Sequence, residues 1–329
     1  MTSLLRRSFV AATALALTGT LAACGSSSDD SSGSSAADGK PVLRVGVQKD
    51  GIRSVLKAAG LLENLPYTIE WSEFTAGLPI VEAAAADQID VAWVGGVPPI
   101  FGAASDANFK VVAAVHEADK QNDSILVPKG SDIHSIADLK GKKIAVFKGS
   151  SADGLMLTSL AQAGLTLKDV QPQYLAPADG LAAFKTGQVD AYVTWDPFVA
   201  QAQVEDGAVD LTAATDTVAD DAWRQFEVAS SKSLDDAGTR ANIASFVKLV
   251  GQGFDWAKSH SDQWAQGWSD ESGIPVDILK KVTARKQSTV EPVSAEDITA
   301  TQELADRFTE AGEIPKKVDI KSIVDSVLE

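Results

Sequence analysis

The sequence is almost without cysteine, and this excludes two kinds of stabilising site. Cys24 is the single cysteine in 329 residues, so the chain forms no internal disulfide and no cysteine-ligated metal centre. The three histidines show no paired metal-ligand spacing; they are His116, His134 and His260. We therefore expect neither a metal nor a cofactor.

Positive charge is also scarce. The chain has 45 Asp and Glu against 29 Lys and Arg, a formal net charge of −16, which becomes −18 once Arg6 and Arg7 are removed with the leader described below. So acidic a surface argues against nucleic acid, and against a generally anionic membrane surface, as partner. It is still compatible with a small anionic ligand, because a binding site is decided by its local groups.

Long apolar runs are absent beyond an N-terminal leader. Arg6 and Arg7 form a basic start, and Phe9 to Leu17 form an apolar run that is too short to span a membrane. The following Leu21-Ala22-Ala23-Cys24 resembles the cleavage box of bacterial lipoproteins, in which the cysteine becomes lipid-modified and starts the mature chain. The alternative is an ordinary signal peptide with an incidental cysteine.

We therefore predict that residues 1–23 are a lipoprotein signal peptide and that the protein is exported. A lipid on Cys24 would anchor it to the extracytoplasmic face of the cell membrane. Residues 24–40 consist mainly of Ser, Gly, Asp and Ala with nothing to bury, which predicts a flexible linker.

The rest of the chain repeats one plan. Short apolar runs alternate with helical segments, and Gln88-Ile89-Asp90 precedes one such run as Gln188-Val189-Asp190 precedes another, 100 residues later. The pattern predicts two βαβαβ units, each a small parallel sheet covered by helices. Ligands of such sheets lie beyond the carboxyl ends of the strands, so two facing lobes imply a cleft between them. The predicted strands are Leu43 to Val47, Tyr67 to Phe74, Val91 to Val94, Ile144 to Phe147 and Ala191 to Trp195.

A turn in the second unit has the pattern of an anion site. Ile144 to Phe147 leads through Gly-Ser-Ser into a helix, Ser150 suits the N-cap, and Asp153 completes a capping-box pattern. The first backbone N–H groups of such a helix point outward and attract anions. A plain helix cap has the same geometry, so the two interpretations are compatible.

Beyond Leu234 the pattern predicts helices only, and we place this tail on the outside of the first lobe. Trp256, Trp264 and Trp268 are expected to be core residues within it. The predicted organisation is residues 41–120 for the first part of lobe 1, 121–225 for lobe 2, and 226–329 for the return to lobe 1 and the C-terminal helices.

Enzyme motifs are incomplete. Ser54 to Lys57 matches S-x-x-K and Lys185-Thr186-Gly187 matches K-T-G, as in penicillin-recognising serine enzymes, but Gly187 follows a predicted helix and no S-D-N occurs. No coherent set of nucleophile, base and orienting group remains, so we expect a protein that is not an enzyme. An exported serine hydrolase and a purely adhesive lipoprotein are the alternative classes.

Several motifs together resemble one family. They are Val45-Gly46-Val47-Gln48-Lys49, Phe74 to Pro79, Val94 to Phe101, Lys148 to Ala152 and Trp195-Asp196-Pro197. With the lipoprotein box and linker, they resemble the aliphatic sulfonate-binding proteins of ABC importers, which are related to taurine and nitrate binders.

The resemblance implies a two-lobed, periplasmic-binding-protein-like α/β fold of type II, with mainly parallel sheets flanked by helices and a helical C-terminal tail. It also implies a monomer that captures an aliphatic sulfonate or similar small organic anion and delivers it to the transmembrane subunits of a permease. Taurine, nitrate or a pyrimidine-type precursor are the alternative ligands.

Carried over residue by residue, the resemblance implies a set of ligand-binding positions that offer backbone N–H groups, hydroxyls or a cleft wall. They are Gln48, Gly77, Leu78, Gly96, Val97, Ser150, Ser151, Trp195 and Asp196. This chain departs from the family at Gly96-Val97, which predicts a shallower and more apolar wall. It also departs at Asp153, which either caps the helix or pairs with an ammonium of the ligand, the latter favouring taurine.

Overall fold

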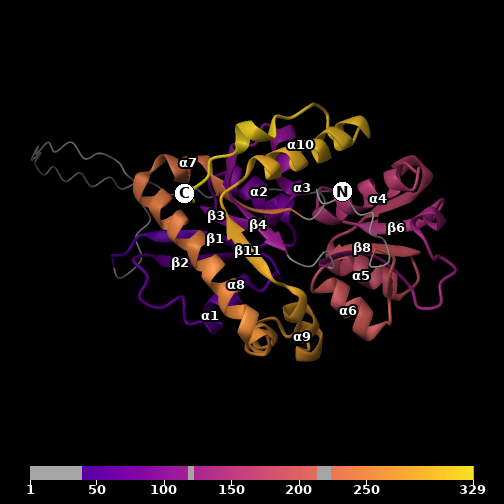
Figure 1. The fold of residues 1–329 in the computed structure, drawn as a ribbon, viewed down its shortest axis with the longest axis horizontal. Coiled ribbons are helices and arrows are strands. Elements are labelled where there is room, and N and C mark those ends of the chain that lie inside the picture. The colour runs from indigo at the N-terminus through magenta and orange to yellow at the C-terminus, as the bar shows by residue number, and fades with distance from the viewer. Residues whose placement is uncertain (1–38, 118–121, 213–223, 329) are drawn as a thin grey trace, which may run out of the picture. The chain divides into compact units, whose positions relative to one another are not determined.

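The computed structural model describes residues 39–117, 122–212 and 224–328. They form two sheets with helices against both faces of each, which confirms the predicted α/β class (Figure 1). The predicted signal peptide, Cys24 and most of the linker lie outside the described residues. Of the helices within them, none is long and apolar enough to cross a membrane.

Six strands form the first sheet, in the order β11-β4-β10-β3-β1-β2. β1 pairs in parallel with β2 and β3, whereas β10 runs antiparallel to β3 and β4. The first predicted βαβαβ unit is therefore present, and a strand from much later in the chain joins it. The strands are β1 (Val42–Val47), β2 (Thr68–Glu73), β3 (Val91–Gly95), β4 (Phe109–Glu117), β10 (Gln225–Ser230) and β11 (Ser288–Glu291).

Five strands form the second sheet, in the order β7-β6-β8-β5-β9. β6 pairs in parallel with β7 and β8, and β5 runs antiparallel to β8 and β9. The pairing thus repeats that of the first sheet. The strands are β5 (Asp123–Val127), β6 (Lys143–Val146), β7 (Gln171–Tyr174), β8 (Ala191–Trp195) and β9 (Val209–Asp210).

The 100-residue offset in the sequence marks equivalent positions in the two sheets. Asp90 accepts a hydrogen bond from the backbone N–H of Arg44 at 2.6 Å, and Asp190 accepts one from Lys143 at 2.8 Å. In both cases the same aspartate also donates its own N–H to the carbonyl of that partner. Each carboxylate therefore links the turn before one strand to a neighbouring strand: Asp90 links the turn before β3 to β1, and Asp190 links the turn before β8 to β6.

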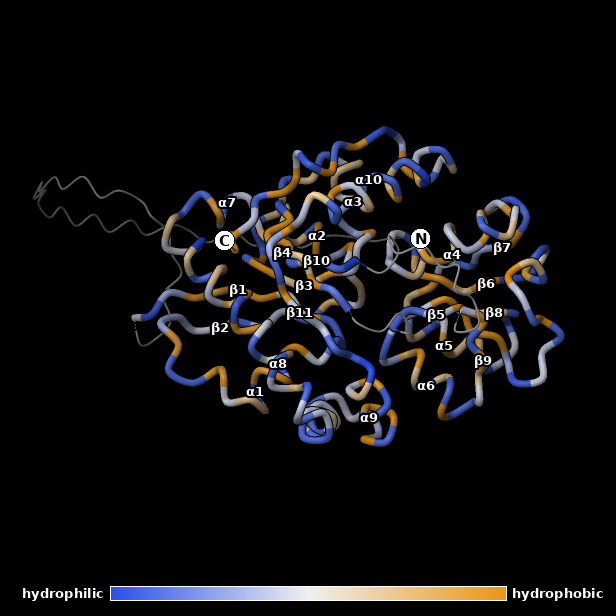
Figure 2. The backbone as a smooth tube through the Cα atoms, in the orientation of Figure 1, coloured by the Kyte–Doolittle hydropathy of each residue, from blue (hydrophilic) through white to orange (hydrophobic). Residues whose placement is uncertain are grey.

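Alternation of side chains along the first sheet creates two apolar faces. Val91 and Trp93 point to one core and Ala92 and Val94 to the other, as expected for a strand covered on both sides. Strands β1, β3 and β4 are correspondingly rich in hydrophobic residues (Figure 2). One face carries α1 (Ile52–Ala58), α8 (Ala237–Ser272) and α9 (Val276–Arg285); the other carries α2 (Gly77–Ala85), α3 (Val97–Ala104) and α10 (Ala295–Glu310).

The second sheet is covered in the same way. Ala191 and Val193 of β8 face a core that contains residues of α4, while Tyr192 faces a core with residues of α5 and α6. The helices are α4 (Ser151–Gln162), α5 (Pro177–Lys185) and α6 (Phe198–Glu205), and a short α7 (Ser231–Asp235) follows β10. Within the described residues, 3₁₀ turns also lie at Ile136–Leu139, Leu167–Asp169 and Ile320–Ile323.

The C-terminal region corrects one prediction and confirms another. The expectation of helices only was wrong, because β11 pairs antiparallel with β4 at the edge of the first sheet. Trp264 and Trp268 are buried as expected and stack on each other at 5.6 Å between ring centroids. The tail also contacts the second sheet's helices, through α9 with α6 and through α10 with α4.

Candidate functional site

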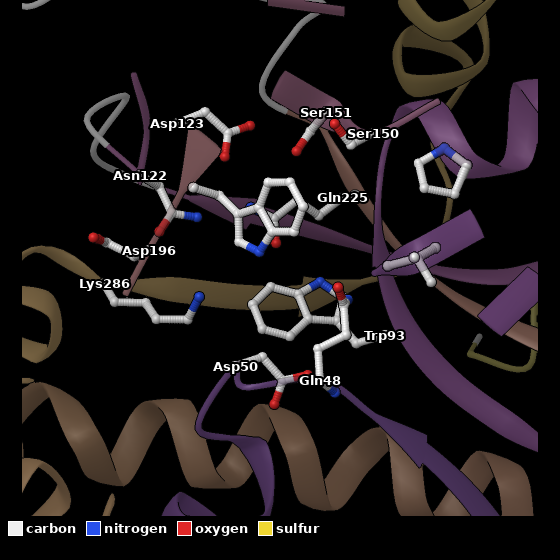
Figure 3. Close-up of a pocket in the computed structure, with 15 residues that line it drawn as sticks. Gln48, Asp50, Trp93, Asn122, Asp123, Ser150, Ser151, Asp196, Gln225 and Lys286 are labelled. Carbon is white, nitrogen blue, oxygen red and sulfur yellow. Dashed lines mark hydrogen bonds between the residues drawn. The ribbon is translucent and has the colours of Figure 1, made fainter. Parts of the chain in front are cut away.

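A pocket lies where the carboxyl ends of the parallel strands of both sheets meet (Figure 3). The residues from the first sheet's elements that line it are Gln48, Asp50, Gly77, Trp93, Val94, Gly95 and Pro98. This is the position at which open α/β sheets bind ligands. The cavity has a volume of about 50 Å³, and since one water needs about 10–15 Å³, it suits a group of a few heavy atoms.

The second sheet supplies the facing wall. Its lining residues are Asn122, Asp123, Ser150, Ser151, Trp195 and Asp196. Two more, Gln225 and Lys286, come from the start of β10 and from the residue after α9. The pocket therefore combines groups that lie far apart in the sequence.

The turn after β1 is shaped by Asp50. Its carboxylate accepts hydrogen bonds from the N–H groups of Gln48 at 2.9 Å and Ile52 at 3.0 Å, which folds the chain back into α1. Gly51 follows with φ of 81°, and a Cβ there would lie 2.7 Å from the ring of Trp268. Glycine is therefore required both by the left-handed backbone and by the tryptophan packed against it.

The turn between β6 and α4 confirms Ser150 as the helix cap but not the predicted capping box, because the Asp153 carboxylate does not bond the N–H of Ser150. The Ser150 hydroxyl accepts a hydrogen bond from the N–H of Asp153 at 3.3 Å and donates one to the carbonyl of Phe147 at 2.6 Å. Asp153 in turn accepts the N–H of Gly149 at 2.9 Å, so its carboxylate is used within the turn and does not line the pocket. Burial raises the pKa of Asp153 to about 7, with repulsion from Glu313 acting in the same direction.

Ser151 connects the two sides of the pocket. Its hydroxyl forms a hydrogen bond with the carboxylate of Asp123. A Cβ added to Gly95 would lie 3.0 Å from the Ser151 Cβ and 3.1 Å from its hydroxyl oxygen. The end of β3 and the start of α4 therefore approach so closely that any side chain at position 95 would require Ser151 to shift.

Lys286 is a buried base in the pocket wall. Its Nζ lies 4.1 Å from the ring centroid of Trp93 and 3.5 Å from Oε1 of Glu117. The side chains of Lys286 and Glu117 are 4% and 3% exposed. The ammonium is thus held by an aromatic face and a carboxylate rather than by solvent.

An ion pair joins the end of β8 to the end of α9. Arg285 binds Asp196 through two hydrogen bonds, Nε to Oδ2 at 2.7 Å and Nη2 to Oδ1 at 2.6 Å. The Asp196 carboxylate also accepts the N–H of Ala200 at 3.2 Å, and its backbone N–H donates to the carbonyl of Asn122. These bonds fix the pocket wall formed by residues 195 and 196.

Six of the nine sequence-predicted residues line the pocket: Gln48, Gly77, Ser150, Ser151, Trp195 and Asp196. Leu78, Gly96 and Val97 lie outside the lining. Leu78 and Val97 pack against elements of the second sheet: the Leu78 side chain would lie 3.1 Å from a Cβ placed on Gly149, and the Val97 side chain 2.7 Å from a Cβ placed on Gly154. Gly96 packs against the backbone, since a Cβ placed on it would lie 2.5 Å from the carbonyl oxygen of Arg224.

Among the lining residues that the predictions missed are those at the starts of β5 and β10 and the base after α9. Antiparallel pairing explains the first two, because Asp123 pairs opposite Trp195 and Gln225 opposite Gly95. An antiparallel strand begins at the edge where its parallel neighbours end. Asp123 and Gln225, polar residues that come just before apolar stretches of the sequence, were therefore a usable signal, whereas Lys286 had no local one.

The serine of the S-x-x-K match is part of the core. Ser54 is 2% exposed, its hydroxyl donates to the carbonyl of Gly51, and it lies 3.2 Å from the indole nitrogen of Trp264. Lys185 ends α5 and forms an ion pair with Glu205. The two motif halves therefore serve packing and a surface contact in this chain.

Two sheets that meet around a pocket at their strand ends define a two-lobed ligand-binding fold of the periplasmic-binding-protein-like class. The chain belongs to the NMT1/THI5-like family, whose model matches residues 71–264. The relatives that match most of the chain are binding proteins by name.

Two sequence relatives cover most of the chain. A protein of Escherichia coli named "Putative aliphatic sulfonates-binding protein" is 37% identical over 87% of this chain and 89% of its own. A Bacillus subtilis protein of the same name is 30% identical over 86% of each. Among solved structures, the alkanesulfonate-binding protein SsuA of Xanthomonas axonopodis pv. citri, bound to MOPS, is similar with a TM-score of 0.79. It is 32% identical, over 87% of this chain and 99% of that protein.

Proposed function

We propose that the protein is the substrate-binding component of an ABC import system, which captures an aliphatic sulfonate or similar small organic anion and delivers it to a membrane permease. The observation that carries the proposal is the pocket at the strand ends of both sheets, reached by the starts of α2 and α4. The names of the relatives support the sulfonate class.

Backbone amides are the groups that would hold the anion. The hydroxyls of Ser150 and Ser151 are already bonded to Phe147 and Asp123. The first N–H groups of a helix have no partner within the helix, so the starts of α4 and α2 at Ser151 and Gly77 can offer theirs. The partial positive charge of a helix N-terminus adds to the attraction.

Magnitudes are consistent with binding in this pocket. Hydrogen bonds to a charged group contribute about 1.5–3 kcal/mol each, so five or six could supply roughly 10–15 kcal/mol. Association costs at least about 4 kcal/mol, and micromolar affinity corresponds to about −8 kcal/mol. Donors from one sheet alone would supply about half of the total, which favours closure of both sides on the ligand.

The proposal extends to the organisation of the full chain. Residues 1–23 would be removed as a signal peptide, a lipid on Cys24 would anchor the exported protein, and residues 24–40 would give it reach. Residues 41–120 and 226–329 would form the lobe around the first sheet and 121–225 the lobe around the second, acting as a monomer.

Binding of a sulfonate panel tests the function. We expect ethanesulfonate, 2-hydroxyethanesulfonate or 2-aminoethanesulfonate, present at 100 times its dissociation constant, to stabilise the fold by about 2.7 kcal/mol. Trp195→Ala should weaken binding at least about tenfold, because it removes an aromatic wall worth about 1.5–3 kcal/mol of apolar contact. Thermal unfolding and titration calorimetry measure both effects.

Trp256→Ala is the matched control. Trp256 is stacked on His260 at 4.5 Å and does not line the pocket, so affinity should be unchanged. If all three sulfonates leave the melting temperature and the calorimetric signal unchanged, the proposed function is wrong.

A further inference from the structure

The described residues around the pocket carry more acids than bases. Asp196 is paired with Arg285, and Glu117 with Lys286. Asp50 uses its carboxylate on two backbone amides of its own turn. Asp123 remains, a carboxylate that lines the pocket and forms no ion pair with a Lys or Arg within the part of the chain that the structure describes.

The surroundings of Asp123 are unfavourable for an isolated negative charge. The residue is 4% exposed, and within the described residues the hydroxyl of Ser151 is the hydrogen-bonding side chain that favours its charged form. The charges that face it are Asp196 at the end of β8, Glu117 at the end of β4 and Lys286 after α9. Burial, with repulsion from Asp196 and Glu117, raises the pKa of Asp123 to about 7.

Asn122 provides an independent indication of a missing partner. It is 8% exposed and lines the pocket, and its Oδ1 accepts no hydrogen bond within the described residues. Buried side-chain oxygens are normally satisfied. Asn122 and Asp123 lie next to each other at the wall of the same pocket (Figure 3), so one group of a ligand could contact both side chains.

We propose that the ligand is zwitterionic: its protonated amine lies against Asp123 and Oδ1 of Asn122, while its sulfonate faces the amide ends of α4 and α2. The inference rests on the proposed function and names the substrate class of that site. An ammonium supplies donors to both acceptors and a positive charge to Asp123. Trp195, which also lines the pocket, can favour a cation as well, because an aromatic face attracts positive charge. A ligand that carries only negative charge would add to the excess of carboxylates over basic groups around the pocket.

A matched pair of ligands tests the inference. 2-Aminoethanesulfonate and 2-hydroxyethanesulfonate have the same number of heavy atoms and differ in an ammonium against a hydroxyl. At pH 8 we expect the amine to bind at least about tenfold tighter, a difference of about 1.4 kcal/mol, by titration calorimetry.

The pH dependence of the wild-type protein separates the two ligands without any variant. From pH 6 to 8 Asp123 loses its proton, so affinity for the amine should rise and affinity for the hydroxyl compound should fall. Asp123→Asn should abolish the preference for the amine. Asp132→Asn, which makes the same change at an exposed position, should keep it.

Equal affinities in the wild-type protein, or parallel pH profiles, overturn the zwitterion inference while the proposed function stands. A preference for the amine that survives Asp123→Asn in a folded variant, judged by circular dichroism, overturns the assignment to Asp123. If neither sulfonate binds, the proposed function fails and this inference fails with it.

Discussion

Arg285→Ala is expected to lower the free energy of unfolding by about 3–5 kcal/mol, the range for breaking a buried ion pair from one side. The Arg285 and Asp196 side chains are 13% and 1% exposed, and two hydrogen bonds of 2.6 and 2.7 Å join them. Without the guanidinium, a buried carboxylate would stay unpaired beside the pocket. Chemical denaturation at pH 7 measures the loss.

The chain contains a matched exposed pair. Arg240 binds Asp325 through two hydrogen bonds of 2.6 and 2.9 Å, but these side chains are 36% and 37% exposed. Arg240→Ala should therefore cost at most about 1 kcal/mol. Adding Asp196→Asn to Arg285→Ala should recover part of the loss, because it removes the unpaired charge. Equal losses for the two arginine variants would show that burial of the Arg285 pair does not matter.

Glu227→Gln is expected to stabilise the protein at pH 7 and to change little at pH 5. Glu227 is 0% exposed in β10, and neither of its carboxylate oxygens has a hydrogen-bond partner within the described residues. Burial, aided by repulsion from Asp50, raises the pKa of Glu227 from 4.5 to about 8.

The sign follows from proton binding. Between pH 4.5 and 8 the folded protein holds a proton on Glu227 that the unfolded chain has lost, so stability falls as pH rises through this window. One pKa unit corresponds to about 1.4 kcal/mol. Glutamine resembles the protonated acid and removes this slope. The variant should gain about 3 kcal/mol at pH 7, or about 5 °C in melting temperature.

An exposed glutamate of the same sheet serves as the control. Glu70 lies on β2, and Glu70→Gln should alter stability by less than about 0.5 kcal/mol at either pH. Denaturant titrations of both variants at pH 5 and pH 7 measure the effect. A Glu227→Gln effect that is the same at the two pH values would contradict the buried, protonated carboxyl.

The two βαβαβ units were predictable because their signals are local. Apolar runs such as Val91 to Val94 are buried on both faces, and the aspartates before β3 and β8 make the same backbone hydrogen bonds. β11 was not predictable in this way. It has four residues, Ser288–Glu291, and lies at the edge of the sheet. It lacks the continuous apolar run by which a central strand is recognised in a sequence, and its hydrogen bonds to β4 hold it in place.

The residues that line the pocket were predictable where they lie in a turn between a strand and a helix. Ser150 and Gly77 sit at helix starts directly after strands, and such positions are visible in the sequence. The charge balance was not visible, because it depends on partners far apart in the chain. Lys286 meets Glu117 and Trp93 only once α9 has packed against the sheet. Arg285 pairs with Asp196, whereas Asp123 forms no ion pair within the described residues.

The position of the ligand's sulfur atom in a crystal of the complex tests the central claim most directly. The chain has one cysteine and two methionines, so a bound sulfonate should give a separate peak in an anomalous difference map. The account predicts this peak inside the pocket, with the sulfonate oxygens within about 3 Å of the amide nitrogens at the starts of α4 and α2. A sulfur bound elsewhere, with the pocket between Ser151 and Gly77 left to water, would contradict it.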